Sequence, residues 1–164
     1  MKQILLPILA AIAFIVLVGF LTQGVQNGKI SLANITQEKT EINISDTKIQ
    51  VETARSDVER KKGLSKRESL GDKEGMLFIF PQKNIQPPFW MKDMKFAIDI
   101  IWIDDGKVVQ IDENIPAPET GIPDEDLVFY TANQPVDYVL EVKAGFVEKN
   151  NIEKGDSVDL SLLE

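Results

Sequence analysis

The chain has 164 residues, a formal net charge of −8 at pH 7, and neither cysteine nor histidine. Without these residue types it can form no disulfide, Cys/His zinc site, thiol nucleophile or Ser-His-Asp relay. The negative charge repels phosphate backbones, so we expect no nucleic-acid partner. The sequence predicts no catalytic residue, no metal site and no cofactor.

The first predicted element is an apolar segment from Ile4 to Leu21 that contains no charged residue. As a helix rising about 1.5 Å per residue, it is long enough to cross a bilayer. A buried core helix would show one polar face, which this segment lacks. We therefore predict a transmembrane anchor over residues 1–22, with membrane contact through residues 4–21.

A cleavable signal peptide is the alternative, although its apolar run is usually shorter, at roughly 7–15 residues. Thr22-Gln23-Gly24 is a poor cleavage site that could still be cut. Lys2 precedes the apolar segment, and the positive-inside rule then places the N-terminus in the cytoplasm. We expect a single-pass protein of the cytoplasmic membrane with its domain outside, or a secreted or periplasmic domain if the segment is cleaved.

Residues 23–47 are rich in Asn, Thr, Gln and Ser and show no sustained period, which predicts a flexible tether. The globular domain is then expected over residues 48–163. It begins with an alternating strand at 48–54. Ser56 followed by Glu59 is a capping-box pattern, so a short helix is expected directly afterwards, over 57–62.

Two continuous apolar segments, 75–81 and 96–104, predict strands that are buried on both faces. The segment 89–91 between them is short and very apolar. Asp105-Gly106 predicts a hairpin that leads into a strand over 107–112. An acidic loop with three prolines follows over 116–126.

The segment 136–142 alternates cleanly, with Leu140 on one face and Val139 and Glu141 on the other. A second short helix is expected over 144–150 and a closing strand over 158–162. The predicted fold is α+β and mainly β. It is a small barrel-like or curled mixed sheet with two short helices, preceded by the N-terminal transmembrane helix.

Five motifs in this order resemble the bacterial and archaeal family DUF192, a domain of unknown function. They are Lys62-Gly-Leu64, Gly75-Met-Leu-Phe-Ile-Phe-Pro81, Phe89-Trp-Met-Lys-Asp93 with Ile98-Asp-Ile100, Tyr138-Val-Leu-Glu-Val-Lys-Ala-Gly145, and Gly155-Asp156. The resemblance covers about residues 49–160 and implies a compact, mostly β domain. It implies no activity. The family tends to have Asn-Thr where this chain has Asp93-Met94.

Five residues are candidates for a ligand site: Trp90, Lys92, Asp93, Asp99 and Glu141. An aromatic side chain beside a cation and acids is typical of a site for a polar ligand. Three of them also have a structural reading: Trp90 as a core wedge, Glu141 as a solvated strand residue, and Asp99 as a cap of backbone N–H groups or a partner of Arg67 or Lys95. A buried Asp99 requires partners or a raised pKa.

Three functions remain open. The first is a non-catalytic binding or interaction module for a small polar ligand, a glycan or an envelope protein. The second is a hydrolase or transferase of cell-envelope polymer that uses Asp99 and Glu141 as a carboxylate pair. The third is an envelope assembly or stability factor, which an exposed apolar patch would favour.

Overall fold

The structure, a computed structural model, describes residues 39–163. In these residues the chain forms a seven-stranded mixed sheet in the order β6-β5-β8-β3-β2-β1-β9 and a two-stranded sheet of β4 and β7. The strands are β1 (Lys39–Ile44), β2 (Thr47–Ala54), β3 (Glu74–Ile79), β4 (Phe89–Trp90), β5 (Ile98–Asp104), β6 (Lys107–Ile115), β7 (Phe129–Tyr130), β8 (Tyr138–Lys143) and β9 (Val158–Asp159).

The α-helices are short: α2 (Asp57–Lys62) and α3 (Phe146–Asn150). Single turns of 3-10 helix lie at η1 (Asp124–Asp126) and η2 (Ser161–Leu163). The expectation of a mainly β, curled mixed sheet with two short helices is confirmed for the described residues, since β2 and β3 are parallel and the other pairs antiparallel.

The predicted anchor at residues 1–22 lies outside the described residues. Between Lys39 and Leu163, no helix has the length and apolar character needed to span a membrane.

Strand β1 corrects the predicted boundary between tether and domain. It lies inside the segment 23–47, yet it pairs antiparallel with β2 over its whole length, and Ile42 and Ile44 are buried. Two apolar side chains among polar neighbours give too weak an alternation to be recognised in the sequence. The folded domain therefore includes residues from Lys39 onward.

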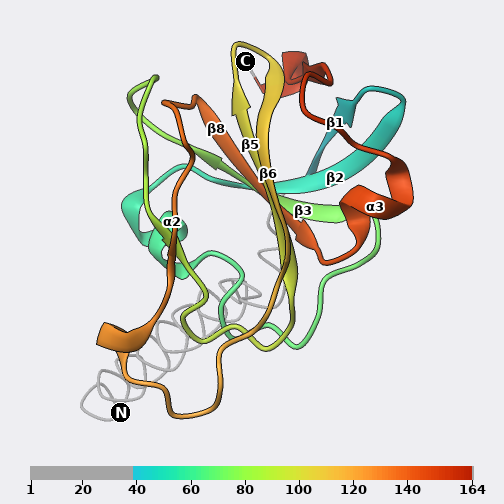
Figure 1. The fold of residues 1–164 in the computed structure, drawn as a ribbon. Coiled ribbons are helices and arrows are strands. Elements are labelled where there is room, and N and C mark those ends of the chain that lie inside the picture. Colours follow the sequence, from blue (N-terminus) through green and yellow to red (C-terminus); the bar gives the residue numbers. More distant parts are fainter. Residues whose placement is uncertain (1–38, 164) are drawn as a thin grey trace, which may run out of the picture. The chain divides into compact units, whose positions relative to one another are not determined.

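The sheet curls into a half-barrel, with α2 and α3 on opposite sides of it (Figure 1). The curl brings the start of β6 to the segment before β9, where Lys107 and Ser157 form an isolated bridge. Val108 N–H donates to Asp156 O at 2.9 Å, and Val158 N–H donates to Gly106 O at 2.8 Å. The two ends of the strand order are thus joined at this point.

The β5–β6 hairpin has the predicted turn. Asp105 and Gly106 have φ values of 47° and 66°. Positive φ at both central residues is the type I′ geometry, which matches the twist of the flanking strands.

Two apolar clusters lie on opposite faces of the sheet. Leu77, Ile101 and Leu140 belong to the cluster that also contains Phe146 of α3. Met76 and Val139 belong to the other cluster, which includes Leu64 and Phe89 from the covering segments. The predicted alternation of β8 is therefore confirmed.

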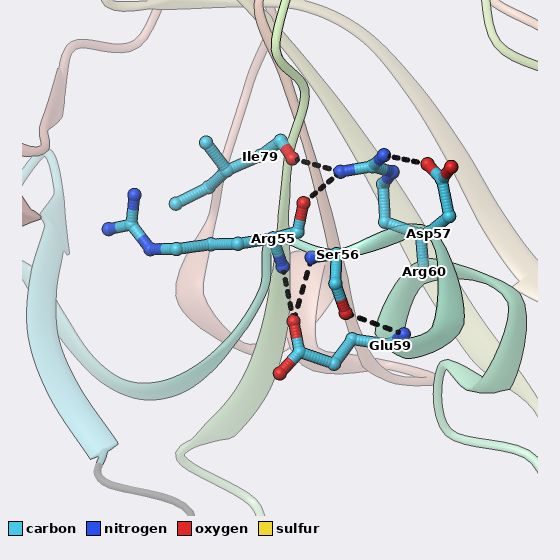
Figure 2. A network of polar contacts seen from close by, with 6 residues as sticks. All are labelled: Arg55, Ser56, Asp57, Glu59, Arg60 and Ile79. Carbon is cyan, nitrogen blue, oxygen red and sulfur yellow. Dashed lines mark hydrogen bonds and ion pairs between the residues drawn. The ribbon is translucent and has the colours of Figure 1, made fainter.

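The capping box and the bounds of α2 are confirmed (Figure 2). Ser56 Oγ accepts from Glu59 N–H at 3.2 Å, and the Glu59 carboxylate accepts from Ser56 N–H at 2.8 Å. Arg60 donates to Ile79 O at 2.9 Å and also contacts Arg55 O and the Asp57 carboxylate. These contacts hold the helix against the end of β3 and so position its C-terminal lysines.

Two C-terminal elements are shorter than predicted. Helix α3 begins at Phe146 rather than residue 144, because Gly145 has a left-handed φ of 81°. The closing strand ends at Asp159, and η2 replaces the end of the expected segment 158–162.

Candidate functional site

A cavity of about 260 Å³ lies beside the C-terminal end of α2, the strands β3 and β8, and the segment that contains β4. Five aromatic side chains line it: Phe78, Phe80, Phe89, Trp90 and Phe129. Five charged side chains also line it: Arg60, Lys61, Lys62, Lys92 and Glu141. A concave, mostly apolar site with a few polar groups is the usual form of a small-molecule site.

Glu141 is the buried acid of this cavity. Its Cα partners are Met76 on β3 and Ile100 on β5, so its neighbours across both ladders on this face are apolar. Glu141 is 5% exposed, and its Oε2 atom has no hydrogen-bond partner in residues 39–163. A buried carboxyl oxygen without a partner loses the hydrogen bonds that water would supply.

Burial raises the pKa of Glu141 to about 8, although the charge of Arg67 opposes the shift. The carboxyl group therefore carries its proton at neutral pH and can donate as well as accept a hydrogen bond. A strongly shifted acid at a cavity wall is a common feature of functional sites.

Arg67 does not form an ion pair with Glu141, because its guanidinium group is paired with Glu52. Its two terminal nitrogens donate to the two carboxylate oxygens of Glu52, at 2.8 and 2.6 Å. The hydrogen bond from Arg67 is the main reason that the pKa of Glu52 is lowered, and the same pairing raises the pKa of Arg67. The sheet face thus carries one paired acid and one unpaired acid, with Met76 between them in register.

The aromatic wall has a buried part and an exposed part. Phe89 packs edge-to-face on Phe78, with ring centroids 4.8 Å apart, and fixes the buried part. Trp90 stacks on Phe129 at 5.5 Å, and these side chains are 39% and 55% exposed. The antiparallel pairing of β4 and β7 brings Trp90 and Phe129 together as Cα partners.

Lys92 lies at the same mouth. Its Nζ atom is 5.7 Å from the Trp90 ring centroid and forms an ion pair with Asp124. Trp90, Lys92 and Glu141, three of the five residues predicted from the sequence, therefore border one cavity.

Asp99 lies on the other face of the sheet. It precedes Ile100, the partner of Glu141, so its side chain projects into the opposite cluster. The carboxylate accepts hydrogen bonds from the backbone N–H groups of Asn114, Gly145 and Val147, at 2.8, 3.3 and 3.1 Å. Asp99 thus caps backbone groups, and the structure does not bring it together with Glu141.

Asp93 also lies away from the cavity. It has a φ of 59° in the turn closed by the hydrogen bond from Met94 N–H to Met91 O. Its side chain lies 3.8 Å from the ammonium group of Lys66 and borders a second, more polar hollow. The left-handed turn directs Asp93 away from the site that its neighbour Lys92 lines.

The sequence did not predict that several other residues line the cavity, chiefly Lys61, Lys62, Phe78 and Phe129. Phe129 follows an acidic loop, and only its pairing with Trp90 places it at the cavity. Lys61 and Lys62 are ordinary residues for the last turn of a helix. No local pattern in the sequence distinguishes them.

Comparisons with known proteins find solved structures with a similar overall fold. A candidate transcription regulator from Sinorhizobium meliloti 1021, solved by crystallography, is 27% identical with a TM-score of 0.67, over 77% of this chain and 97% of that one. A protein of unknown function from Novosphingobium aromaticivorans DSM 12444 is 29% identical with a TM-score of 0.65, over 74% of this chain and 84% of that one. No curated protein matches the chain.

The model of the family DUF192, described as "Uncharacterized ACR, COG1430", matches residues 39–160. This range begins at the first residue of β1 and ends after β9, so it contains every residue that lines the cavity. The chain is therefore a member of the DUF192 family.

Proposed function

We propose that the domain is a non-catalytic binding module that takes a small ligand in the cavity beside α2. The observation that carries the proposal is the Glu141 carboxyl, which is buried at the cavity without a partner for Oε2. Leaving a buried polar group unsatisfied costs about 1–3 kcal/mol. A ligand that supplies the missing hydrogen bond recovers this cost and covers the exposed rings of Trp90 and Phe129.

The cavity supports binding better than catalysis. Apart from the four cations, Glu141 is the only ionisable residue that lines it within residues 39–163. A hydrolase of the glycosidase type requires two carboxyl groups across one cleft, about 5–10 Å apart. Asp99 faces the opposite side of the sheet, so the pair that the second hypothesis required does not form.

The test uses neutral aromatic probes, p-cresol and indole, added to the full chain and followed by isothermal titration calorimetry and NMR. We expect binding with shifts confined to cavity residues. Trp90→Ala should weaken binding by about threefold to tenfold, since an aromatic contact contributes about 0.5–1.5 kcal/mol beyond its buried area.

Leu162→Ala is the matched control, because Leu162 is an exposed apolar residue that does not line the cavity. It should leave probe affinity unchanged. Failure of both probes to bind at millimolar concentration would contradict the proposal. So would binding that Trp90→Ala leaves unaltered.

We also propose that the apolar segment Ile4–Leu21 tethers this domain to the outer face of the cytoplasmic membrane. The full chain should stay in the membrane fraction after an alkaline carbonate wash. Its domain should be accessible to protease from outside intact spheroplasts. Release by carbonate, or protection from protease, would contradict this placement.

The role of an envelope assembly factor stays a prediction. Val128 and Phe129 are 62% and 55% exposed beside the cavity mouth, which is compatible with contact to a partner protein. Replacing Val128 with Ser separates the two functions, because Val128 does not line the cavity and its loss should leave probe binding intact.

A further inference from the structure

The cavity has the opposite charge from the protein. The chain carries a formal net charge of −8, yet the cavity is lined by four cations and one acid. That acid, Glu141, keeps its proton at neutral pH because burial raises its pKa to about 8. The local field at the site is therefore positive, which favours an anionic group on whatever binds there.

Two of the four cations are already engaged. Arg60 is paired with Asp57, and Lys92 is paired with Asp124. Lys61 and Lys62 are exposed, and neither ammonium group has an ion-pair partner within residues 39–163. These two lysines are therefore the groups that are free to hold an anion at the cavity.

The buried side of the cavity, around Glu141, is apolar and, within residues 39–163, carries no available cation. Glu141 is 5% exposed and lies among apolar neighbours, with Oε2 unpartnered in the described residues. A protonated carboxyl there can exchange hydrogen bonds with a neutral hydroxyl or carbonyl. A second anion at this depth would lose its hydration without an available cation, because Arg67 is held by Glu52.

An amine is the main alternative, because Glu141 could ionise to receive it. Lys61 and Lys62, however, line the same space without an ion-pair partner in residues 39–163 and would repel an ammonium group. The aromatic rings attract cations only weakly at exposed sites, by about 0.5–1 kcal/mol. The balance of charge therefore opposes an amine.

We infer that the ligand is a small amphipathic acid, bound with its anionic group on Lys61 and Lys62, its apolar body against the aromatic wall, and a neutral hydrogen-bonding group at Glu141. This inference rests on the proposed binding function and specifies its ligand class.

The experiment compares three probes by calorimetry on the full chain at pH 7: 3-(4-hydroxyphenyl)propanoate, 3-phenylpropanoate and tyramine. The hydroxylated acid should bind roughly tenfold tighter than tyramine, which carries an ammonium group in place of the carboxylate. It should bind about threefold to tenfold tighter than 3-phenylpropanoate, which lacks the hydroxyl that reaches Glu141.

Two variants locate each end of the ligand. The double variant Lys61→Gln/Lys62→Gln should weaken both acids about threefold to tenfold. Lys107→Gln/Lys154→Gln, the same charge change at two exposed lysines outside the cavity, should leave them unchanged. Glu141→Leu should abolish the advantage of the hydroxylated acid over 3-phenylpropanoate. Melting temperatures of all variants verify folding.

The outcomes separate the inference from the binding function itself. If tyramine binds as tightly as the acids, or if the Lys61/Lys62 variant behaves like the control, the inference is overturned while the binding function stands. If the acids fail to bind but p-cresol binds, the inference about the ligand class is also overturned while the binding function stands. If no probe binds, both fall.

Discussion

Arg67 donates two hydrogen bonds to Glu52, whereas its effect on Glu141 is only that its positive charge partly opposes the rise in the pKa of that carboxyl. Glu52 and Glu141 are both partners of Met76, one on each neighbouring strand. On this face of the sheet, one acid therefore lies on each side of Met76, and of these two acids Arg67 forms hydrogen bonds only with Glu52. Burial keeps the cavity acid neutral, and Arg67, held by Glu52, lowers its pKa only in part.

Glu52→Gln should therefore affect both acids. It removes one partner of a mostly buried ion pair, whose side chains are 28% and 10% exposed, and should destabilise the fold by about 1–3 kcal/mol. It also frees Arg67 to move toward Glu141, so the pKa of Glu141 should fall below about 8. Urea denaturation and NMR titration of the side-chain carboxyls measure the two effects. An unchanged pKa of Glu141 would contradict the competition for Arg67.

The stability of the protein should depend on pH through Glu141. Its pKa rises from 4.5 to about 8 on folding, so the folded state binds more protons between these values. Its contribution is therefore greatest below pH 4.5 and is lost as the pH rises toward 8. The loss between pH 5 and pH 8 is on the order of 3 kcal/mol.

Glu141→Gln keeps the shape and removes the titration, so its unfolding free energy should fall less over this range. Urea denaturation of both proteins at pH 5 and pH 8 provides the measurement, with other groups acting equally in both. Parallel pH profiles for the two proteins would show that Glu141 does not retain its proton on folding.

Asp99 should matter for stability and not for binding. Asp99→Ala removes the acceptor of three backbone N–H groups, those of Asn114, Gly145 and Val147. We expect a loss of about 2–4 kcal/mol in unfolding free energy. Glu113→Ala, an exposed substitution on the same sheet, should cost much less.

Probe affinity at the cavity should be the same for Asp99→Ala as for the unaltered chain, measured where both remain folded. A loss of probe binding in Asp99→Ala without a loss of stability would show that Asp99 contributes to the binding site.

Ser56→Ala should loosen α2 and with it the lysines at the cavity. Loss of the capping hydrogen bond to Glu59 N–H costs about 1 kcal/mol. Ser56→Asp retains a cap and should recover most of the stability. Hydrogen exchange of the amides in 57–62 provides the measurement, and equal protection in the Ala and Asp variants would contradict a role for the cap.

Features encoded by neighbouring residues could be predicted from the sequence. The Ser56/Glu59 box, the Asp105-Gly106 turn and the alternation around Leu140 each depend on a few consecutive residues. Strand β1 could not be predicted in the same way, because it is stabilised by pairing with β2 and β9 rather than by a strong pattern of its own.

The candidate site could be predicted only in part. Trp90 and Lys92 were predicted because an aromatic side chain beside a cation is typical of a ligand site, and Glu141 because its strand face could form the wall of a cleft. Asp99 is unusual in an apolar segment, but the two-residue period of the strand puts it on the other face, and which face borders a cavity depends on the covering segments. Phe129 lies 39 residues from Trp90, so their contact is a property of the tertiary fold.

The bridge between Lys107 and Ser157 has a consequence for the order of folding. Ser157 and β9, which follows it, contact two strands that are far apart in the strand order: β6 through this bridge and β1 through strand pairing. Loops that join such distant residues close slowly, because their entropy is lost before most contacts form. During synthesis, a chain that has not yet released residues 155–159 leaves the edges of β1 and β6 open to pairing with other chains. For this domain, we therefore expect protection from aggregation to come late in folding and to depend on residues 155–159.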